Sequence, residues 1–415
     1  MSDFASILPI KKTHTPADQG ELASIVADAH RTGTPLYPIG GGTSLDFGLP
    51  AKAAGEGLSL AGLNRIVDYP VRDMTVTVEA GVTMQVLADL LAKERQRLPI
   101  DVPQSGQATI GGVIATNWNG PRRFGQGSLR DYVIGISAVD GRGMPFKGGG
   151  RVVKNVAGYD FCKLLTGSLG TLGVITQTTL RLKPIPEQSV LVATALPDAA
   201  AVEKLLAALV SSKTVPAAIE VLAGPAWESD PAWQMLAKPA AAPLYVVVGL
   251  EGSAAEVDSM THQLAREWDE LGIEEPLVVG QSAELWRRLI EFPAAGDSPL
   301  VIKASVVPSG ATAFVDAARR VEPECSIQAH AGNGIVIVRF AKFPASGLSR
   351  ALIGELLPAA TTHQGQVVVL SNTTGSEMTH VSAWGTANPS FDLMAAVKRK
   401  FDPRDILNRR RFVYS

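Results

Sequence analysis

The chain is poor in cysteine, in net charge and in long uninterrupted apolar runs. Its two cysteines, Cys162 and Cys325, are too few for a disulfide framework or the ligands of an iron–sulfur cluster, so we expect two buried small side chains. The 38 Lys and Arg residues nearly balance the 40 Asp and Glu residues, which argues against a nucleic-acid partner. What remains is a 415-residue globular chain, 46% hydrophobic and 19% charged, long enough for two domains.

Membrane-targeting signals are also scarce. Residues 1–12 include Asp3 and only a short apolar run, so they do not read as a signal peptide. The longest apolar runs, such as 239–250, contain proline and are too short to span a bilayer. We therefore expect no transmembrane segment and a cytoplasmic location, with peripheral attachment at the inner membrane only through a partner.

Glycine, by contrast, is concentrated in three places. The first is a run after a short β-like segment: Pro38, Ile39, Gly40, Gly41, Gly42, Thr43, Ser44 and Leu45. Successive glycines let backbone N–H groups converge into a nest for an anion, most often phosphate. No lysine follows, which excludes a Walker loop, and Gly48 and Pro50 make a poor helix start, which excludes a Rossmann fingerprint. The alternative is an ordinary turn.

Two further glycine clusters follow in the same half of the chain. Thr109 is expected to N-cap a short helix that begins with Gly111 and Gly112, either beside a ligand or in close helix–strand packing. The third cluster covers 154–160 and 167–176. Three clusters of different design suit one extended ligand that has a pyrophosphate and a large planar ring.

The secondary-structure pattern is α+β throughout. In the first 184 residues we expect helices over 19–32 and 84–92 and strands over 35–39, 66–80, 130–139 and 174–182. Two prolines make 183–187 a linker that breaks strand pairing. Strand and helix candidates then alternate, which indicates an antiparallel sheet covered by helices. The expected strands are 190–195, 244–249, 300–307 and 334–340, and the expected helices are 199–210, 254–271, 311–321 and 348–357. The tail, 391–412, begins helical and ends irregular.

The order of the glycine motifs resembles the FAD-binding domain shared by vanillyl-alcohol oxidase and p-cresol methylhydroxylase. The matching segments are 38–44, 78–83, 109–112 and 167–176. The resemblance implies a p-cresol-methylhydroxylase-type FAD-binding domain of two α+β subdomains at 5–187. An α+β FAD-linked oxidase C-terminal (cap) domain at 188–390 would follow, and a tail at 391–415 would return to the first domain. It places the pyrophosphate on the first loop and the flavin ring towards the second domain.

Further motifs resemble the E-subunit family of bacterial glycolate oxidases. They lie at 117–123, 153–160, 381–385 and 398–408. The resemblance implies a complex with a larger flavin subunit and an iron–sulfur subunit, oxidising glycolate, a small 2-hydroxy acid, to glyoxylate and passing electrons towards quinone. The cofactor would be noncovalent FAD, because 38–45 holds no His or Cys. The residues expected to bind it are Pro38, Ile39, Gly40, Gly41, Gly42, Thr43, Ser44, Leu45, Pro103, Ser105, Thr109, Gly111, Gly112, Asn117, Gly120, Ile175 and Asn408.

Three departures separate this chain from the related larger subunits. Their His-Ala-Gly-Asp-Gly-Asn-Leu-His pattern reads here as 330–337 with Asn333 for the acid and Ile337 for the second histidine. Their Glu-His-Gly triplet is absent after His363, and their Asn-Pro-Gly-Arg tail reads Asn408 followed by three arginines. The first two losses put independent hydroxy-acid chemistry in question.

Oxidising a 2-hydroxy acid at a flavin needs a base for the hydroxyl proton and a cation for the carboxylate. His330 is the candidate catalytic base; its alternative is a structural histidine. Arg287 and Lys303 are candidate carboxylate ligands, with solvated surface charge as the alternative. Arg122 and Arg123 face either the flavin or, more in keeping with the pattern, a partner or solvent. We expect no metal site, because one histidine does not make one.

Three functional readings follow. The chain is a catalytic FAD-dependent subunit that oxidises glycolate, or a flavin-bearing assembly subunit whose partner performs the chemistry. The third is a stand-alone flavoenzyme of the same fold acting on another 2-hydroxy acid or a sugar-type substrate. Reduction of the flavin by glycolate, without or with partner subunits, separates the first two readings.

Overall fold

The computed structural model describes residues 4, 7–150, 158–228, 231–233, 236, 243–273, 276–280, 282–294, 296–375 and 377–413. Residues 153–157, in the motif at 153–160 and the third glycine cluster, lie outside this set. The contacts divide the chain into two units. Unit 1 comprises Met1–Asn119, Ser128–Ile185 and Ala387–Ser415, and unit 2 comprises Gly120–Gly127 and Pro186–Thr386. In the described part of the chain, no helix has the length and apolar character needed to cross a membrane.

Unit 1 begins with a small parallel sheet in the order β1-β3-β2. Its strands are β1 (Ile10–His14), β2 (Leu36–Ile39) and β3 (Gly55–Ser59). Helix α1 (Gln19–Thr32) connects β1 to β2, has the predicted bounds and buries Leu22, Val26 and Ala29. Asp18 caps this helix by accepting from the Glu21 N–H, and Gly33 ends it in the left-handed conformation.

The second sheet of unit 1 is antiparallel, in the order β4-β5-β9-β7-β8. Its strands are β4 (Ile66–Asp68), β5 (Thr75–Glu79), β7 (Val133–Val139), β8 (Pro145–Gly149) and β9 (Val174–Arg181). Three helices pack on it, α2 (Met84–Ala92), α3 (Ile110–Thr116) and α6 (Phe161–Leu165). The predicted N-caps of α2 and α3, Thr83 and Thr109, are confirmed.

Two local predictions in unit 1 were wrong. Residues 130–132 are not strand but belong to the helical turn α5 (Leu129–Tyr132), because Ser128 and Asp131 form a capping box at its start. The two units divide within the expected linker at 183–187, between Ile185 and Pro186, but strand pairing does not break at its start, where β10 (Lys183–Pro184) forms a two-residue ladder with β6 (Gln96–Arg97). Pro184 has no N–H, and the pairing continues through the Ile185 N–H, which donates to the Arg95 carbonyl.

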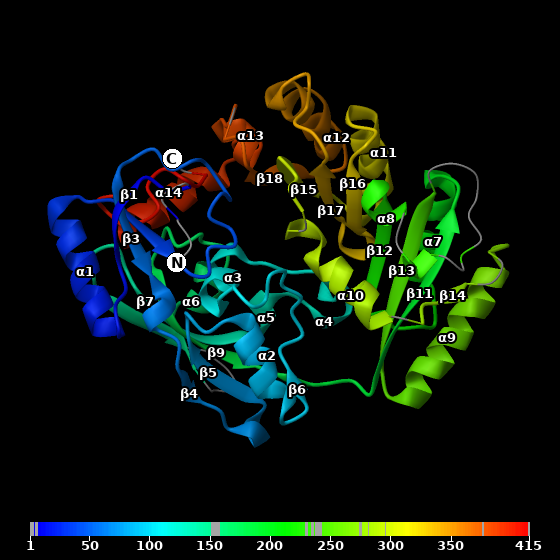
Figure 1. The fold of residues 1–415 in the computed structure, drawn as a ribbon, viewed down its shortest axis with the longest axis horizontal. Helices are drawn as coiled ribbons and strands as arrows, with labels where there is room; N and C mark the ends of the chain where they lie inside the picture. The colour runs from blue at the N-terminus through cyan, green and yellow to red at the C-terminus, as the bar shows by residue number, and fades with distance from the viewer. Residues whose placement is uncertain are drawn as a thin grey trace. The chain divides into compact units, whose positions relative to one another are not determined.

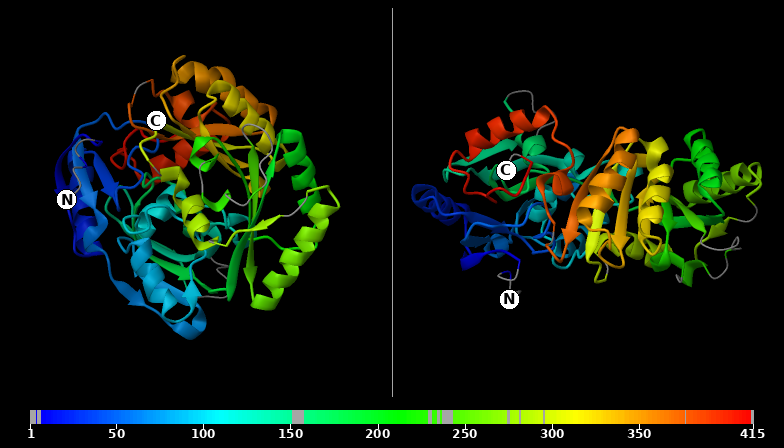
Figure 2. Two further views of the ribbon diagram at one scale, coloured as in Figure 1. Left: turned by 45° about the vertical axis from the view of Figure 1, so that its right-hand side comes forward. Right: turned by 90° about the horizontal axis from the view of Figure 1, so that it is seen from above.

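The C-terminal tail folds into unit 1. Helix α14 (Ser390–Phe401), red in Figure 2, packs Phe401 against the rings of Phe146 and Phe161. After the helix the chain runs beside β2, where the Leu36 N–H donates to the Ile406 carbonyl at 2.7 Å. The Asn408 N–H returns a bond to the Leu36 carbonyl at 3.0 Å. The last part of the chain thereby reaches the strand that leads into the first glycine run.

Unit 2 is built on an eight-stranded antiparallel sheet (Figure 1). Its strand order is β14-β11-β13-β12-β16-β17-β15-β18. The strands are β11 (Gln188–Leu196), β12 (Ala218–Ala223), β13 (Leu244–Gly252), β14 (Leu277–Val278), β15 (Leu300–Ser305), β16 (Ser326–His330), β17 (Ile335–Phe340) and β18 (Gln366–Asn372). The sequence pattern missed β12, β16 and β18, because β12 and β16 carry Glu220, Gln328 and His330 at positions that a core strand normally fills with apolar residues.

One face of this sheet carries the apolar core of unit 2. Its strand residues pack against α7 (Ala199–Val210), α9 (Ala254–Asp269), α11 (Ala311–Val321) and α12 (Leu357–Thr362), the last preceded by a π-helix at Arg350–Leu356. The predicted bounds of α7 and α11 are confirmed. Since side chains alternate along a strand, Val221 and Ala329 enter this core while Glu220 and His330 point to the opposite face.

Candidate functional site

The first glycine run leaves β2 and packs against the backbone before α3. A Cβ on Gly41 would lie 1.7 Å from the Gln107 carbonyl oxygen, and one on Gly40 would lie 2.3 Å from the Thr109 hydroxyl oxygen. Gly42 has φ +80°, in the left-handed region. The run therefore consists of glycine because two loops touch here and the backbone turns through φ > 0.

The backbone of this loop offers hydrogen-bond donors. Within the described residues, no protein acceptor pairs with the N–H groups of Gly41, Gly42, Thr43 or Ser44. The backbone directly after these residues is held by the tail, because Arg411 donates to the Leu45 and Phe47 carbonyls. A loop fixed at its carbonyls with donors left over is suited to a phosphate.

The two glycines of the second cluster have different surroundings: Gly111 is closely packed, whereas a Cβ on Gly112 would have almost no neighbours. The Gly111 N–H donates to the Ala80 carbonyl at 2.9 Å, and a Cβ at Gly111 would lie 2.7 Å from Ala80 Cβ. A Cβ at Gly112 would meet only the Thr109 hydroxyl, at 3.3 Å. Gly111 thus follows the close-packing alternative, whereas Gly112 leaves the first turn of α3 accessible. The Ser105 hydroxyl donates to the Gln85 amide oxygen at 3.1 Å.

The third cluster and the tail reach the same place. The N–H groups of Gly167 and Leu169 donate to carbonyls at the end of α3, and the Asn408 amide donates to the Leu169 carbonyl at 2.6 Å. A Cβ on Gly170 would lie 3.4 Å from that Asn408 amide nitrogen and 3.6 Å from Pro38 Cγ. Asn117 caps α3 with φ 53° and lies beside Gly167. The three clusters predicted from sequence are therefore neighbours in unit 1.

Other predicted cofactor residues occupy structural positions. Ile39 and Ile175 are core side chains with 0% and 5% exposure, and Leu45 and Pro103 are also buried. Gly120 falls in unit 2, where its carbonyl accepts from the Arg123 N–H. These residues shape the loops, whereas the backbone of 41–44 provides donors that could hold a diphosphate.

A second polar cluster lies on the sheet of unit 2. His330 Nδ1 is 2.8 Å from each carboxylate oxygen of Glu220, and the Gln328 amide donates to the same carboxylate at 2.8 Å. The side chains of His330 and Glu220 are 3% and 0% exposed. Among the described residues, His330 Nε2 has no hydrogen-bond partner. Sequence reasoning selected His330 but missed Glu220, whose only signal was an acid within an apolar run.

Lys303 lies on the same face as this cluster. In the ladder, Ile337 of β17 stands opposite both Gln328 and Lys303, which places Lys303 two strands from Gln328. Burial, together with a smaller contribution from the positive charge of Arg123, lowers the pKa of Lys303 from 10.5 to about 8. Solvated surface charge, the alternative offered for Lys303, is wrong. Arg287, by contrast, is an exposed helix residue that pairs with Glu284.

Arg122 is an internal anchor rather than a surface or partner residue. Its Nε donates to Glu251 at 2.7 Å, and its guanidinium lies 3.8 Å from the centre of the Trp286 ring. The two charged side chains are 13% and 3% exposed. This contact fixes 120–127 within unit 2, so the expectation of a solvent or partner role was wrong.

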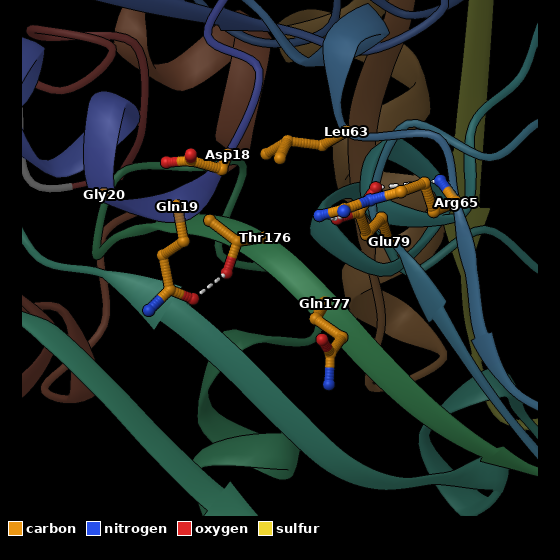
Figure 3. Close-up of a pocket in the computed structure, with 8 residues that line it drawn as sticks. All are labelled: Asp18, Gln19, Gly20, Leu63, Arg65, Glu79, Thr176 and Gln177. Carbon is orange, nitrogen blue, oxygen red and sulfur yellow. Dashed lines mark hydrogen bonds and ion pairs between the residues drawn. The ribbon is translucent and has the colours of Figure 1, made fainter.

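A pocket of about 290 Å³ lies elsewhere in unit 1 (Figure 3). Arg65 pairs with Glu79 at 2.7 Å, and Thr176 donates to Gln19 at 2.6 Å. None of the predicted cofactor residues lines it. Because the Arg65 and Glu79 charges in this pocket are paired with each other, we assign the pocket no part in the candidate site. Across the described residues, no group of three His, Cys, Asp or Glu side chains is arranged to hold a metal ion.

Curated relatives share segments of this chain. It is 36% identical over 157 residues to the glycolate oxidase subunit GlcE of Escherichia coli, covering 38% of this chain and 44% of that protein. It is 31% identical over 210 residues to GlcD of Bacillus subtilis (51% and 45%), and 36% identical over 183 residues to a D-2-hydroxyglutarate dehydrogenase of Xanthomonas citri (44% and 39%). The chain thus spans less than half the length of these relatives.

Solved structures show the same fold. p-Cresol methylhydroxylase superposes with a TM-score of 0.74 at 17% identity, covering 98% of this chain and 90% of that one. Alkyldihydroxyacetonephosphate synthase gives 0.70 at 16% identity, with 96% and 77% covered. These likenesses confirm the predicted fold class.

The family matches cover most of the chain. The model of the FAD binding domain matches residues 11–148, and that of the C-terminal domain of FAD linked oxidases matches 185–412. They confirm FAD as the cofactor and FAD-dependent oxidoreductase as the enzyme class of the family. The loops in unit 1 fit such a cofactor, because they join unpaired backbone donors to glycine positions where a side chain has no room. This chain belongs to the family of FAD-linked oxidases.

Proposed function

We propose that this FAD-linked oxidase oxidises a small 2-hydroxy acid, with glycolate the expected substrate and glyoxylate the product. The observation that carries the proposal is the polar face of the unit 2 sheet. On it a buried His330–Glu220 pair and the partly buried Lys303 stand within a few strands of one another. The relatives support it, because they are named as glycolate oxidase subunits and a D-2-hydroxyglutarate dehydrogenase.

The residues divide the chemistry between them. His330 Nε2 accepts the hydroxyl proton, and Lys303, aided by the nearby charge of Arg123, holds the carboxylate. Bound FAD supplies the two-electron acceptor for the C2 hydride. The loop 38–45, with Gly112 and Asn408, would hold that cofactor without a covalent bond, because 38–45 contains no His or Cys.

We further propose that the chain works in a complex with a larger flavin subunit and an iron–sulfur subunit. Its two cysteines are both buried and cannot ligate a cluster, so electrons leaving the flavin need another carrier. A cytoplasmic complex at the inner membrane, in which an iron–sulfur subunit passes the electrons towards quinone, would provide this carrier.

One observation favours a second function, that of a flavin-bearing subunit without catalysis of its own. Ile337 stands on the polar face, opposite Gln328 and Lys303, where the resemblance leads one to expect a histidine. An apolar side chain there removes one proton-accepting group from the site. In this case the partner subunit performs the oxidation.

Anaerobic titration with glycolate decides between the two. The purified, FAD-loaded chain is titrated alone and then with its partner subunits, while the oxidised flavin band near ~450 nm is followed. Bleaching of the chain alone supports a catalytic subunit. Bleaching that appears only with partners supports the second function, and bleaching by sugar-type substrates but not by 2-hydroxy acids would refute both.

A further inference from the structure

Glu220 holds an unusual place for a carboxylate. It lies in the middle of β12, directly opposite His330 of β16 in the antiparallel ladder. Its side chain is fully buried, and both of its oxygens are 2.8 Å from His330 Nδ1. The Gln328 amide donates to the same group at 2.8 Å. A carboxylate buried in a sheet persists only when its oxygens receive hydrogen bonds.

This geometry determines which ring nitrogen carries the proton. An ionised carboxylate accepts hydrogen bonds and donates none, so His330 must present Nδ1–H to Glu220. In the neutral imidazole the other nitrogen, Nε2, is then an acceptor. Nε2 is buried and lacks a partner among the described residues, as does Oε1 of the neighbouring Gln328. Two buried acceptors side by side indicate a ligand that brings a donor, such as a hydroxyl group.

We propose that Glu220 is a positioning residue that makes His330 Nε2 the proton acceptor for the substrate hydroxyl. The inference rests on the proposed function. When the 2-hydroxy acid is oxidised, the O–H proton moves to Nε2 as the C=O bond forms, and bound FAD would accept the C2 hydride with its two electrons. The Glu220 carboxylate then balances the imidazolium charge on His330, at the atoms where the two side chains already touch.

The first test reads the tautomer without reference to activity. The chain has six histidines, so ¹⁵N labelling of the histidine rings gives a small set of long-range proton–nitrogen correlations. His330→Gln assigns the signal by its loss; if that variant does not fold, substitution of the other five assigns it by elimination. We expect a neutral ring protonated at Nδ1 in the FAD-loaded protein at pH 7.5. A ring protonated at Nε2, or an imidazolium, overturns the inference whether or not the protein oxidises glycolate.

The second test separates positioning from folding. Glu220→Gln keeps the shape of the side chain but removes its charge, and we expect kcat to fall by roughly 10²- to 10³-fold with KM changed less than about threefold. Gln328→Met removes the hydrogen bond from Gln328 to Glu220 and leaves the histidine contact, so it should keep the Nδ1–H tautomer. Asp140→Asn is the matched control for kcat, because it removes the charge of a buried carboxylate that pairs with Arg142 in unit 1, and it should change kcat less than about threefold.

The outcomes keep the inference distinct from the function on which it rests. If glycolate is not oxidised under any condition but the Nδ1–H tautomer is found and disappears in Glu220→Gln, the proposed function fails and the tautomer assignment stands. If glycolate is oxidised and Glu220→Gln retains kcat within about threefold, the positioning role is refuted while the function survives. Retained flavin absorbance in each variant shows that the cofactor site is intact.

Discussion

One buried lysine contributes strongly to holding the tail of the chain in unit 1, and removing its charge gives a sharp test of the fold. Lys398 on α14 is 5% exposed. Its Nζ lies 2.5 Å from Asp402 and donates to the carbonyls of Thr171 and Leu407 at 2.9 and 3.0 Å. Asp402 in turn accepts from the Leu407 N–H at 2.7 Å. The same Nζ lies 3.2 Å from Asp405, so Lys398→Met keeps the aliphatic stem and removes four contacts.

The expected loss of unfolding free energy depends on the buried Asp402 carboxylate that remains after the substitution. Breaking a buried ion pair by removing one partner costs about 3–5 kcal/mol, because the other charge stays buried without compensation. Asp402 keeps backbone donors from Ile406 and Leu407, so we expect the lower end, about 3 kcal/mol. Unit 1 holds roughly 200 residues, for which this corresponds to a fall in Tm of about 6–12 °C.

The assay is thermal and urea unfolding of the FAD-loaded protein, followed by flavin fluorescence so that unit 1 is reported. Arg31→Met is the matched control, since Arg31 pairs with Asp28 at the surface with both side chains more than 70% exposed. It should cost less than about 1 kcal/mol. A Lys398→Met protein with Tm and FAD affinity within error of the parent would refute the view that this contact holds the tail.

Three further predictions concern the glycine loop, Lys303 and the thiols. Gly41→Ala should abolish FAD binding, measured by flavin retention on gel filtration, because its Cβ would meet the Gln107 carbonyl; Gly106→Ala, with nothing within 4 Å, should retain it. Lys303 has a pKa lowered to about 8 and a model-peptide value of 10.5, so its burial penalty is fully present below pH 8 and fades as pH rises towards 10.5. Lys303→Met should therefore raise stability more at pH 7 than at pH 10. An equal shift of the urea unfolding midpoint at the two pH values would contradict this. Burial raises the thiol pKa of Cys162 to about 11 and of Cys325 to about 12, so a thiol reagent at pH 8 should label neither until urea is added.

The sequence determined the local elements and the identity of the cofactor motifs. The period of apolar residues gave α1, α7 and α11 with the bounds that the structure has, and hydroxyl residues at Thr83 and Thr109 marked the starts of α2 and α3. Such features depend on residues within a few positions of one another, so the sequence shows them directly. The order of the glycine clusters along the chain was also visible in the sequence and led to the FAD-binding family.

Only the tertiary structure decided which partners these residues have. Gly41 is required by the Gln107 carbonyl and Gly111 by Ala80, rather than by a ligand in the space of a side chain. Arg122 pairs with Glu251, 129 positions away in the sequence, and His330 pairs with Glu220, 110 positions away. Strand register brings such residues together, and register depends on the pairing of whole strands that are far apart in the sequence. The chemistry of a residue type was therefore readable from the sequence, but its charge partner and its burial were set by the sheet.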